Sequence, residues 1–195
     1  EGRAKIGIDK TDPALLKMFH LSNRDATPKM SIKDSIDKLR IIPVSISYEF
    51  DPCAEMKAKE LFEIDKNGFF EKDENSDTIS ISEGLNGEKG KIHLKFGTEI
   101  IANDEDPANI ALQIDKQIIS NYKLHPSNYI AYDILQSEDA SIGLPLKELD
   151  IDHAFIESKR EEFMEKLTLL ADELKPYFLQ NYANPVINKM RIDEQ

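Results

Sequence analysis

The chain of 195 residues carries a formal charge of −12 at pH 7, and 40% of its residues are hydrophobic while 32% are charged. This apolar content is enough for a packed core and excludes a wholly disordered chain. The negative charge excludes the nonspecific attraction to nucleic acid or anionic lipid that basic proteins show. No run approaches the roughly 18 apolar residues of a membrane span, and the single cysteine, Cys53, indicates a reducing compartment.

The positive charges are concentrated near the start of the chain. Residues 1–50 contain nine Lys or Arg and seven Asp or Glu, so the remainder carries −14. Within this quarter, the opening "EGRAKIG" places two cations, Arg3 and Lys5, beside Gly2 and Gly7. Glycine lets the backbone approach an anion, and charge-assisted hydrogen bonds strengthen the contact. The opening is thus a candidate phosphate-binding loop, although it has neither the Walker spacing nor a GxGxxG register and, taken alone, is better explained as a solvated loop.

Capping signals predict several helices along the chain. A carboxylate directly before a proline is typical of a helix N-cap and its first turn. Such pairs are Asp12-Pro13, Asp51-Pro52 and Asp106-Pro107. They predict helices over residues 13–20, over residues 52–63 and from residue 106 onward. A further helix is expected over residues 31–40, where Ser31 is followed by apolar residues at helical spacing.

Alternating apolar residues predict three strands. Residues 42–48 read as a buried strand, residues 78–82 ("TISIS") as a second, and residues 90–97 ("GKIHLKFG") as a third with one wet face or edge. Residues 151–174 carry a long amphipathic helical pattern that Pro176 interrupts. The order of elements predicts an α/β fold with a helical C-terminal portion.

Four segments in this order resemble one enzyme superfamily. "EGRAKIG" is similar to the Glu-Gly-Thr-Arg-Ser block of the glycerol-3-phosphate and lysophosphatidate acyltransferases, and "IIPVSISYE" resembles their fourth block, an apolar strand with a proline. "KIHLKFGTEI" resembles the downstream strand that ends in Phe-Gly-Glu-Pro-Ile. "DKQIISNYKLHPSNYIAYDIL" is similar to the next segment of a longer bacterial branch. The resemblance covers residues 1–135.

The resemblance implies the remainder of a mixed sheet flanked by helices. Residues 1–139 would be the C-terminal part of an acyltransferase domain, and residues 140–195 a helical extension packed on it. The family moves a fatty acyl group from acyl carrier protein or coenzyme A to a hydroxyl of glycerol 3-phosphate or lysophosphatidate. The thioester is a co-substrate, and no bound cofactor or metal is implied. The protein would be cytoplasmic, peripheral on the inner face of the cytoplasmic membrane.

The family's motifs assign roles to five residues of this chain. Glu1, Gly2 and Arg3 match the third block, with Lys5 as a second cation, and would bind the acceptor phosphate. Pro43 matches the proline of the fourth block and would shape the pocket wall.

The chain departs from the family in two ways. The Glu-Gly-x-Arg spacing is one residue shorter here, which leaves the aim of Arg3 open. The family's catalytic His-x4-Asp precedes the third block, so we expect it upstream of Glu1, no catalytic residue in this chain, and no turnover by the chain alone. The alternative function is a noncatalytic acidic interaction domain with an acyltransferase-like fold.

His20 and Asp25 fit the His-x4-Asp spacing but lie after the phosphate-binding block. Five residues of helix rotate by about 500°, which leaves the two side chains about 140° apart. We therefore expect His20 to be solvated at a helix end.

Other candidate sites have simpler explanations. Residues 73–84 begin like a calcium loop but lack its glycine and its bidentate glutamate, so an acidic surface loop is expected. Asp150, Asp152 and His153 could hold a metal, although acids at a helix start are better explained by the helix dipole. Cys53 is expected in the core. An aromatic patch with the same expected role consists of Tyr122, Tyr129, Tyr132 and His125.

Overall fold

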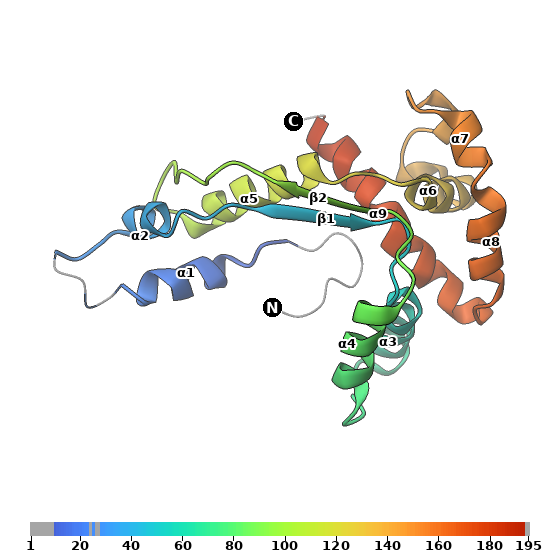
Figure 1. The fold of residues 1–195 in the computed structure, drawn as a ribbon, viewed down its shortest axis with the longest axis horizontal. Coiled ribbons are helices and arrows are strands. Elements are labelled where there is room, and N and C mark those ends of the chain that lie inside the picture. The colour runs from blue at the N-terminus through green and yellow to red at the C-terminus, as the bar shows by residue number, and fades with distance from the viewer. Residues whose placement is uncertain (1–9, 24, 26–27, 194–195) are drawn as a thin grey trace. The chain divides into compact units, whose positions relative to one another are not determined.

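The computed structural model describes residues 10–23, 25 and 28–193, and the chain is mostly helical (62%) with a two-stranded antiparallel sheet (Figure 1). Helices and strands occur together, and the C-terminal portion is helical, as the sequence predicted. A mixed sheet flanked by helices is not present among the described residues. No helix in the described part of the chain is long and apolar enough to cross a bilayer.

The chain forms two compact units, which we describe separately. The smaller unit comprises Lys10–Ser47 and His93–Lys123, and the larger comprises Tyr48–Ile92 and the described residues from Leu124 onward. The smaller unit contains α1 (Pro13–Leu21), α2 (Ile32–Leu39), α5 (Pro107–Asn121) and most of the strands β1 (Val44–Tyr48) and β2 (Ile92–Phe96). The larger unit contains α3 (Ala54–Asn67), α4 (Ser76–Asn86), α6 (Pro126–Glu138), α7 (His153–Glu157), α8 (Arg160–Thr168), α9 (Lys175–Asp193) and the short 3₁₀ turns Ala140–Ile142, Leu146–Glu148 and Asp172–Leu174. The domain boundary expected after residue 139 is a different division and stays a prediction.

All three Asp-Pro pairs bind the backbone in the same way. Asp12 and Asp106 accept hydrogen bonds from the N–H groups of Ala14 (2.8 Å) and Ala108 (2.9 Å), and each caps its helix. Asp51 accepts from the N–H of Cys53 at 2.9 Å, but α3 begins only at Ala54. The predicted start at Pro52 was therefore two residues early, and the predicted end at residue 63 was early too, since α3 continues to Asn67.

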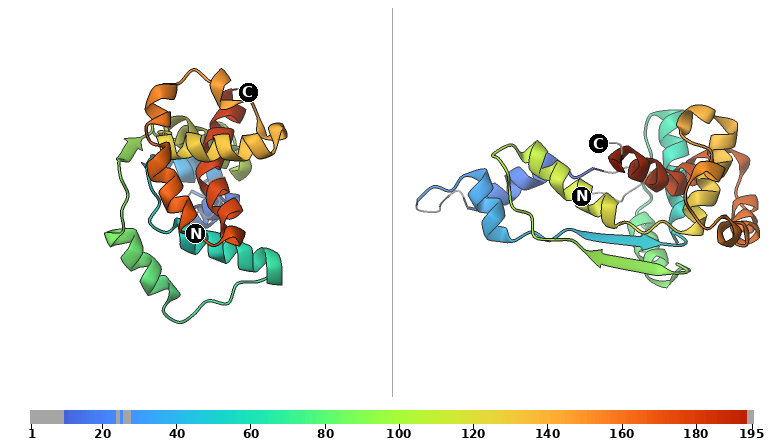
Figure 2. Two further views of the ribbon diagram at one scale, coloured as in Figure 1. Left: turned by 90° about the vertical axis from the view of Figure 1, so that its right-hand side faces the viewer. Right: turned by 90° about the horizontal axis from the view of Figure 1, so that it is seen from above.

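The helices α1, α2 and α5 enclose the core of the smaller unit. Leu16, Ile36 and Ile110 come one from each helix, and all three are at most 1% exposed. The regularly spaced apolar residues that predicted these helices form the face of each helix that packs inward. In the right view of Figure 2, α1 and α5 lie on the same side of the two strands.

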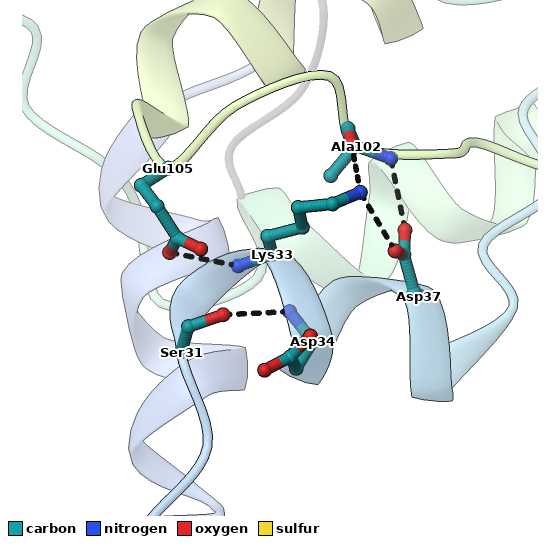
Figure 3. Close-up of polar contacts among 6 residues, drawn as sticks. All are labelled: Ser31, Lys33, Asp34, Asp37, Ala102 and Glu105. Atoms are coloured by element: carbon teal, nitrogen blue, oxygen red, sulfur yellow. Dashed lines mark hydrogen bonds and ion pairs between the residues drawn. The ribbon is translucent and has the colours of Figure 1, made fainter.

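A polar network holds α2 to the loop before α5 (Figure 3). Ser31 caps α2 by accepting from the N–H of Asp34 at 3.0 Å, and the distant Glu105 accepts from the N–H of Lys33 at 3.1 Å. Asp37 accepts from the N–H of Ala102 at 2.8 Å and pairs with Lys33 at 3.1 Å. The Ser31 hydroxyl, followed by the Lys33 N–H, lowers the pKa of Glu105. The sequence indicated the Ser31 cap but not the contribution of Glu105, 72 residues away.

The two strands pair with their apolar residues on one face. The N–H of Glu49 donates to the carbonyl of Lys91, and the N–H of Gly97 donates to the carbonyl of Pro43, both at 2.8 Å. This register places Val44 opposite Phe96 and Ile46 opposite Leu94. The exposed face carries these four side chains, at 36%, 67%, 46% and 50% exposure respectively. The strand predicted over residues 42–48 exists, but its apolar face is open and its serines are buried.

The core of the larger unit lies between α6, α8 and α9. Phe163, Phe178 and Tyr182 form an aromatic cluster with ring centroids 4.9–5.9 Å apart. Asn128 donates from its side-chain amide to the carbonyl of Tyr182 at 2.9 Å, which joins α6 to α9. These contacts bury apolar area and satisfy polar groups inside the core.

Two element predictions in this unit were wrong. Residues 78–82 lie in the helix α4, because a lone strand without a neighbour leaves its backbone groups unpaired, whereas a helix pairs them internally. The long helix predicted over residues 151–174 is divided into α7, α8 and a 3₁₀ turn. Pro176 does not end a helix but lies in the first turn of α9, where a missing N–H costs nothing.

We expect Phe163→Ala to lower the free energy of unfolding by about 3–5 kcal/mol, because it removes the centre of the aromatic cluster. Urea denaturation measures this change. Leu169→Ala is the matched control, since Leu169 is 86% exposed, and it should change stability by no more than about 0.5 kcal/mol. Equal effects of the two substitutions would contradict the assigned core.

We expect Asp37→Asn to lower the stability of the fold more above pH 4 than at lower pH. The Ala102 N–H, assisted by Lys33, lowers the pKa of Asp37 below its usual 3.8. A depressed folded-state pKa contributes stability above the unfolded value, and this contribution is lost as pH falls through the folded pKa. Thermal unfolding at pH 6 and pH 3 should therefore show a smaller deficit of the variant at pH 3. The same deficit at both values would contradict the network.

Candidate functional site

The expected phosphate-binding residues, Glu1, Gly2, Arg3 and Lys5, lie outside the described residues, so their role stays a prediction. Pro43, the expected wall residue, is buried directly before β1. Its carbonyl accepts a hydrogen bond from Gly97, which lines a cleft that lies within the smaller unit.

Pro43 and Gly97 close one end of the sheet. The carbonyl of Pro43 accepts the hydrogen bond from Gly97, and the missing N–H of proline is tolerated because the residue lies just before the strand. A side chain at Gly97 would displace the end of Gln117. A Cβ atom there would collide with Gln117 Oε1 and would lie 3.2 Å from the Pro43 carbonyl oxygen. Glycine at this position lets α5 approach the strand end closely.

Gln117 joins the end of β2 to α5. Its Oε1 accepts a hydrogen bond from the N–H of Thr98 at 2.8 Å. This bond satisfies a backbone donor just beyond the strand, where the ladder no longer supplies a partner. The strand end and the second half of α5 are thereby held at a fixed separation.

A shallow cleft of about 480 Å³ lies between these two segments. We call it the β2–α5 cleft. It is lined by Lys95, Phe96, Gly97, Thr98, Lys116, Gln117, Ser120 and Asn121. The lining combines two cations, two hydroxyls, two amides and one aromatic ring. This set can bind an anion, and it contains no histidine, cysteine or carboxylate.

The two lysines of the cleft have no acidic partner among the described residues. The acids nearest to them in sequence have other partners. Glu99 pairs with Arg40 at 2.9 Å, and Asp115 accepts hydrogen bonds from the N–H and hydroxyl of Thr11 at 2.9 and 2.7 Å.

The buried face of the sheet is polar. Ser45 and Ser47 are 2% and 1% exposed. Ser45 Oγ is the one buried side-chain oxygen or nitrogen among the described residues without a hydrogen-bond partner. The register places Ser45 opposite Lys95, so this hydroxyl lies on the same sheet face as the cleft lysine.

His20 is not solvated as expected. Its Nδ1 lies 3.0 Å from Ser35 Oγ, so the ring joins α1 to α2. This contact gives His20 a structural partner on a neighbouring helix. The substitution His20→Ala is therefore expected to affect the packing of α1 on α2.

The remaining candidates have structural roles. The calcium-like segment, residues 73–84, is largely helical in α4. Asp152 caps α7 by accepting a hydrogen bond from the N–H of Phe155 at 3.0 Å. His153 Nε2 lies 3.1 Å from the Leu149 carbonyl oxygen. No group of three metal-binding side chains occurs within the described ranges. Cys53, His125 and Tyr132 are buried, which confirms their expected place in the core.

The sequence did not predict the cleft, although the charge pattern around Lys116 is a weak signal for it. Lys95 was expected only on a wet strand face, and Lys116 was not singled out. Lys116 has no acid three or four residues away on its helix, where an ordinary surface lysine often has one. Its proximity to Lys95, however, depends on how α5 packs against β2.

Comparison with known proteins assigns no family to the chain. No protein-family model, no curated protein and no solved structure matches it.

We expect Gly97→Ala to expose the Thr98 amide, because the new methyl group displaces Gln117 Oε1 and breaks its hydrogen bond. The local cost should be about 1–2 kcal/mol, or roughly 5- to 30-fold faster hydrogen exchange at Thr98, measured by NMR. Gln117→Ala should produce the same change. Gly84→Ala is the control, since nothing lies within 4 Å of its added Cβ. Unchanged protection of Thr98 in Gly97→Ala would contradict the clamp.

Proposed function

We propose that this chain is the C-terminal part of an acyltransferase that transfers a fatty acyl group from a thioester of acyl carrier protein or coenzyme A to a hydroxyl of glycerol 3-phosphate or lysophosphatidate. The proposal originates in the four segments that resemble this superfamily in the correct order over residues 1–135. In a bacterial cell, such a protein would act in phospholipid synthesis at the inner face of the cytoplasmic membrane.

The observation that supports the proposal most is the pairing of β1 with β2. These strands carry two of the resembling segments, and they are neighbours joined at Pro43 and Gly97. Segments that resemble adjacent blocks of one domain are expected to meet in space if they belong to one fold. Their pairing meets that expectation without depending on any catalytic residue.

The open apolar face of the sheet is the second supporting feature. Val44, Ile46, Leu94 and Phe96 are exposed together, although apolar strand faces are normally covered by another layer. A larger mixed sheet with covering helices would bury them. We therefore propose that β1 and β2 are the remainder of such a sheet, completed by elements that also carry the catalytic His-x4-Asp.

The proposed chemistry divides the roles between two regions. The histidine, oriented by the aspartate, would remove the proton from the acceptor hydroxyl as that oxygen attacks the thioester carbonyl. Arg3 and Lys5 would hold the acceptor phosphate through charge-assisted hydrogen bonds. Pro43 would shape the wall of the pocket. In this proposal the chain contributes phosphate binding and architecture, and the proton transfer occurs on the elements that carry the histidine and aspartate.

The alternative is a noncatalytic interaction domain with the same fold. The exposed apolar residues of α4, namely Ile79, Ile81 and Leu85, favour it because they could pack against a partner protein. The lining of the β2–α5 cleft contains no histidine, cysteine or carboxylate, which is compatible with both functions.

Acylation by the full-length protein tests the proposal. We expect thioester-dependent acylation of glycerol 3-phosphate or lysophosphatidate, and Arg3→Ala should lower kcat/KM for the acceptor by about 10- to 100-fold, mainly through KM. Lys17→Ala, which removes an exposed cation from α1, should leave kcat/KM unchanged. If neither acceptor is acylated by a protein that contains the histidine and aspartate, the interaction domain is the better assignment.

A further inference from the structure

We propose that the outward face of helix α4 binds a basic amphipathic helix of a partner protein. This face consists of Thr78, Ile81 and Leu85, and we call it the α4 face. The acids around α4 select lysine and arginine residues on the partner. The surface lies outside the acyl-transfer chemistry proposed above, so the inference goes beyond that function and gives the alternative interaction domain a partner of defined chemistry.

Helix α4 exposes its apolar side and buries a polar one, the reverse of an ordinary surface helix. Ser80 is its buried residue, and the Ser80 carbonyl accepts a hydrogen bond from the Cys53 thiol at 3.5 Å, just before α3. Ile81 and Leu85 are 63% and 75% exposed. Five residues separate Ser80 from Leu85, which places them about 140° apart around the helix. A small polar side chain therefore faces the rest of the larger unit, and large apolar side chains face outward.

The residues of the α4 face have the spacing by which one helix packs against another. Thr78, Ile81 and Leu85 follow each other by three and four residues, so they lie within about 60° of one another around the helix. The a and d positions of a coiled coil have the same spacing. The strip is about 10 Å long, which corresponds to two helical turns, and a partner helix can cover it.

The described structure supplies little that stabilises α4. The helix has 11 residues and no side-chain hydrogen bond from its N-cap, Asn75, and isolated helices of this length are marginal in water. No other described helix or strand packs extensively against it. Four of its residues have low helix propensity, namely Thr78, Ile79, Ile81 and Gly84. Burial of the α4 face by a partner helix supplies the stabilisation that α4 lacks.

The charges around α4 favour a cationic partner. Residues 69–88 contain six Asp or Glu and one Lys, a balance of −5. Asp77 pairs with Lys72 at 3.1 Å, and Glu88 pairs with Lys166 at 2.6 Å. The other four acids are exposed and form no ion pair with a described residue, namely Glu71, Asp73, Glu74 and Glu83. Charges beside an apolar contact decide which partner binds there and speed up the encounter.

The same charges disfavour other occupants of the α4 face. Anionic lipid headgroups and nucleic acid are repelled by the excess of carboxylates. A second copy of the chain that used the same face would bring two sets of unpaired acids together. A basic amphipathic helix satisfies both the apolar strip and the acids beside it.

Titration of the 195-residue chain with model peptides tests the proposal. The probe is a helical peptide with leucine at its a and d positions and lysine elsewhere, and the matched peptide has glutamate in place of every lysine. With the lysine peptide we expect saturable NMR shifts and slower hydrogen exchange at the amides of residues 79–85. The glutamate peptide should bind at least about tenfold more weakly. The affinity of the lysine peptide should fall as salt is added.

Substitutions separate the α4 face from the general acidity of the chain. Ile81→Ala and Leu85→Ala should each weaken the lysine peptide by about tenfold, because each removes apolar contact. Alanine favours the helix, so α4 itself should persist. Leu169→Ala, at a residue that is 86% exposed and lies outside α4, is the matched control and should bind normally.

A second set of variants tests the charges. The Asp73→Asn/Glu74→Gln double variant should weaken the lysine peptide by about three- to tenfold and flatten its salt dependence. Glu161→Gln removes an exposed acid from α8 and should leave the affinity unchanged.

Each remaining outcome overturns the proposal. Equal binding of the two peptides, or shifts that persist in the Ile81→Ala/Leu85→Ala double variant, would remove the site. Sedimentation of the chain with phosphatidylglycerol vesicles that is lost in this double variant would assign the face to a membrane. A dimer in light scattering that the same variant converts to a monomer would assign it to a second copy. Because none of these measurements needs turnover, failure of the acylation assay leaves them intact, and the two proposals fail separately.

Discussion

The arrangement of the smaller unit depends on the way Gly97 is held between Pro43 and Gln117. The backbone hydrogen bond from Gly97 to Pro43 holds one end of the β1–β2 pairing, as the bond from Glu49 to Lys91 holds the other, and the Gln117 side chain holds the residue after Gly97 to α5. Register decides which face every strand residue occupies, since a shift by one residue exchanges the two faces. The positions of Lys95 and of the exposed apolar residues both follow from this register.

The sheet buries its polar face and exposes its apolar face. Ser45 and Ser47 are buried, and the apolar residues of both strands are exposed. In an isolated two-layer domain, burial of apolar surface would favour the opposite arrangement. The buried serines are compatible with α5 approaching closely, because small side chains leave space between a strand and a helix. The exposed face gains free energy only when another layer covers it, which agrees with the proposed larger sheet.

The larger unit is held together differently, by helix packing around aromatic rings. Phe163, Phe178 and Tyr182 fill the space between α8 and α9, and the side chain of Asn128 ties α6 to the same helix. Asp51, which precedes α3, is joined to this core. Its N–H donates a hydrogen bond to the hydroxyl of Tyr182 at 2.8 Å. Helices supply their own backbone hydrogen bonds, so this unit needs no sheet.

The sequence by itself determined the local features of this protein. Asp12 and Asp106 cap their helices as predicted, because an N-cap needs only a side chain and a backbone two residues later. The apolar spacing of Ile32 and Ile36 and the strand of residues 92–96 were also identified, since both signals are contained within a few residues. The phosphate-binding role of Arg3 and Lys5 remains a prediction from resemblance.

Tertiary structure alone decided the features that join distant residues. Glu105 reaches α2, Gln117 reaches Thr98, and Lys116 meets Lys95 in one cleft, although no local pattern links these positions. The helix at residues 76–86 was mistaken for a strand because alternation over five residues fits both, and only the presence or absence of a pairing partner distinguishes them. Helix caps and apolar periodicity depend on residues that are close in sequence, whereas Lys95 and Lys116 line one cleft only because α5 packs against β2.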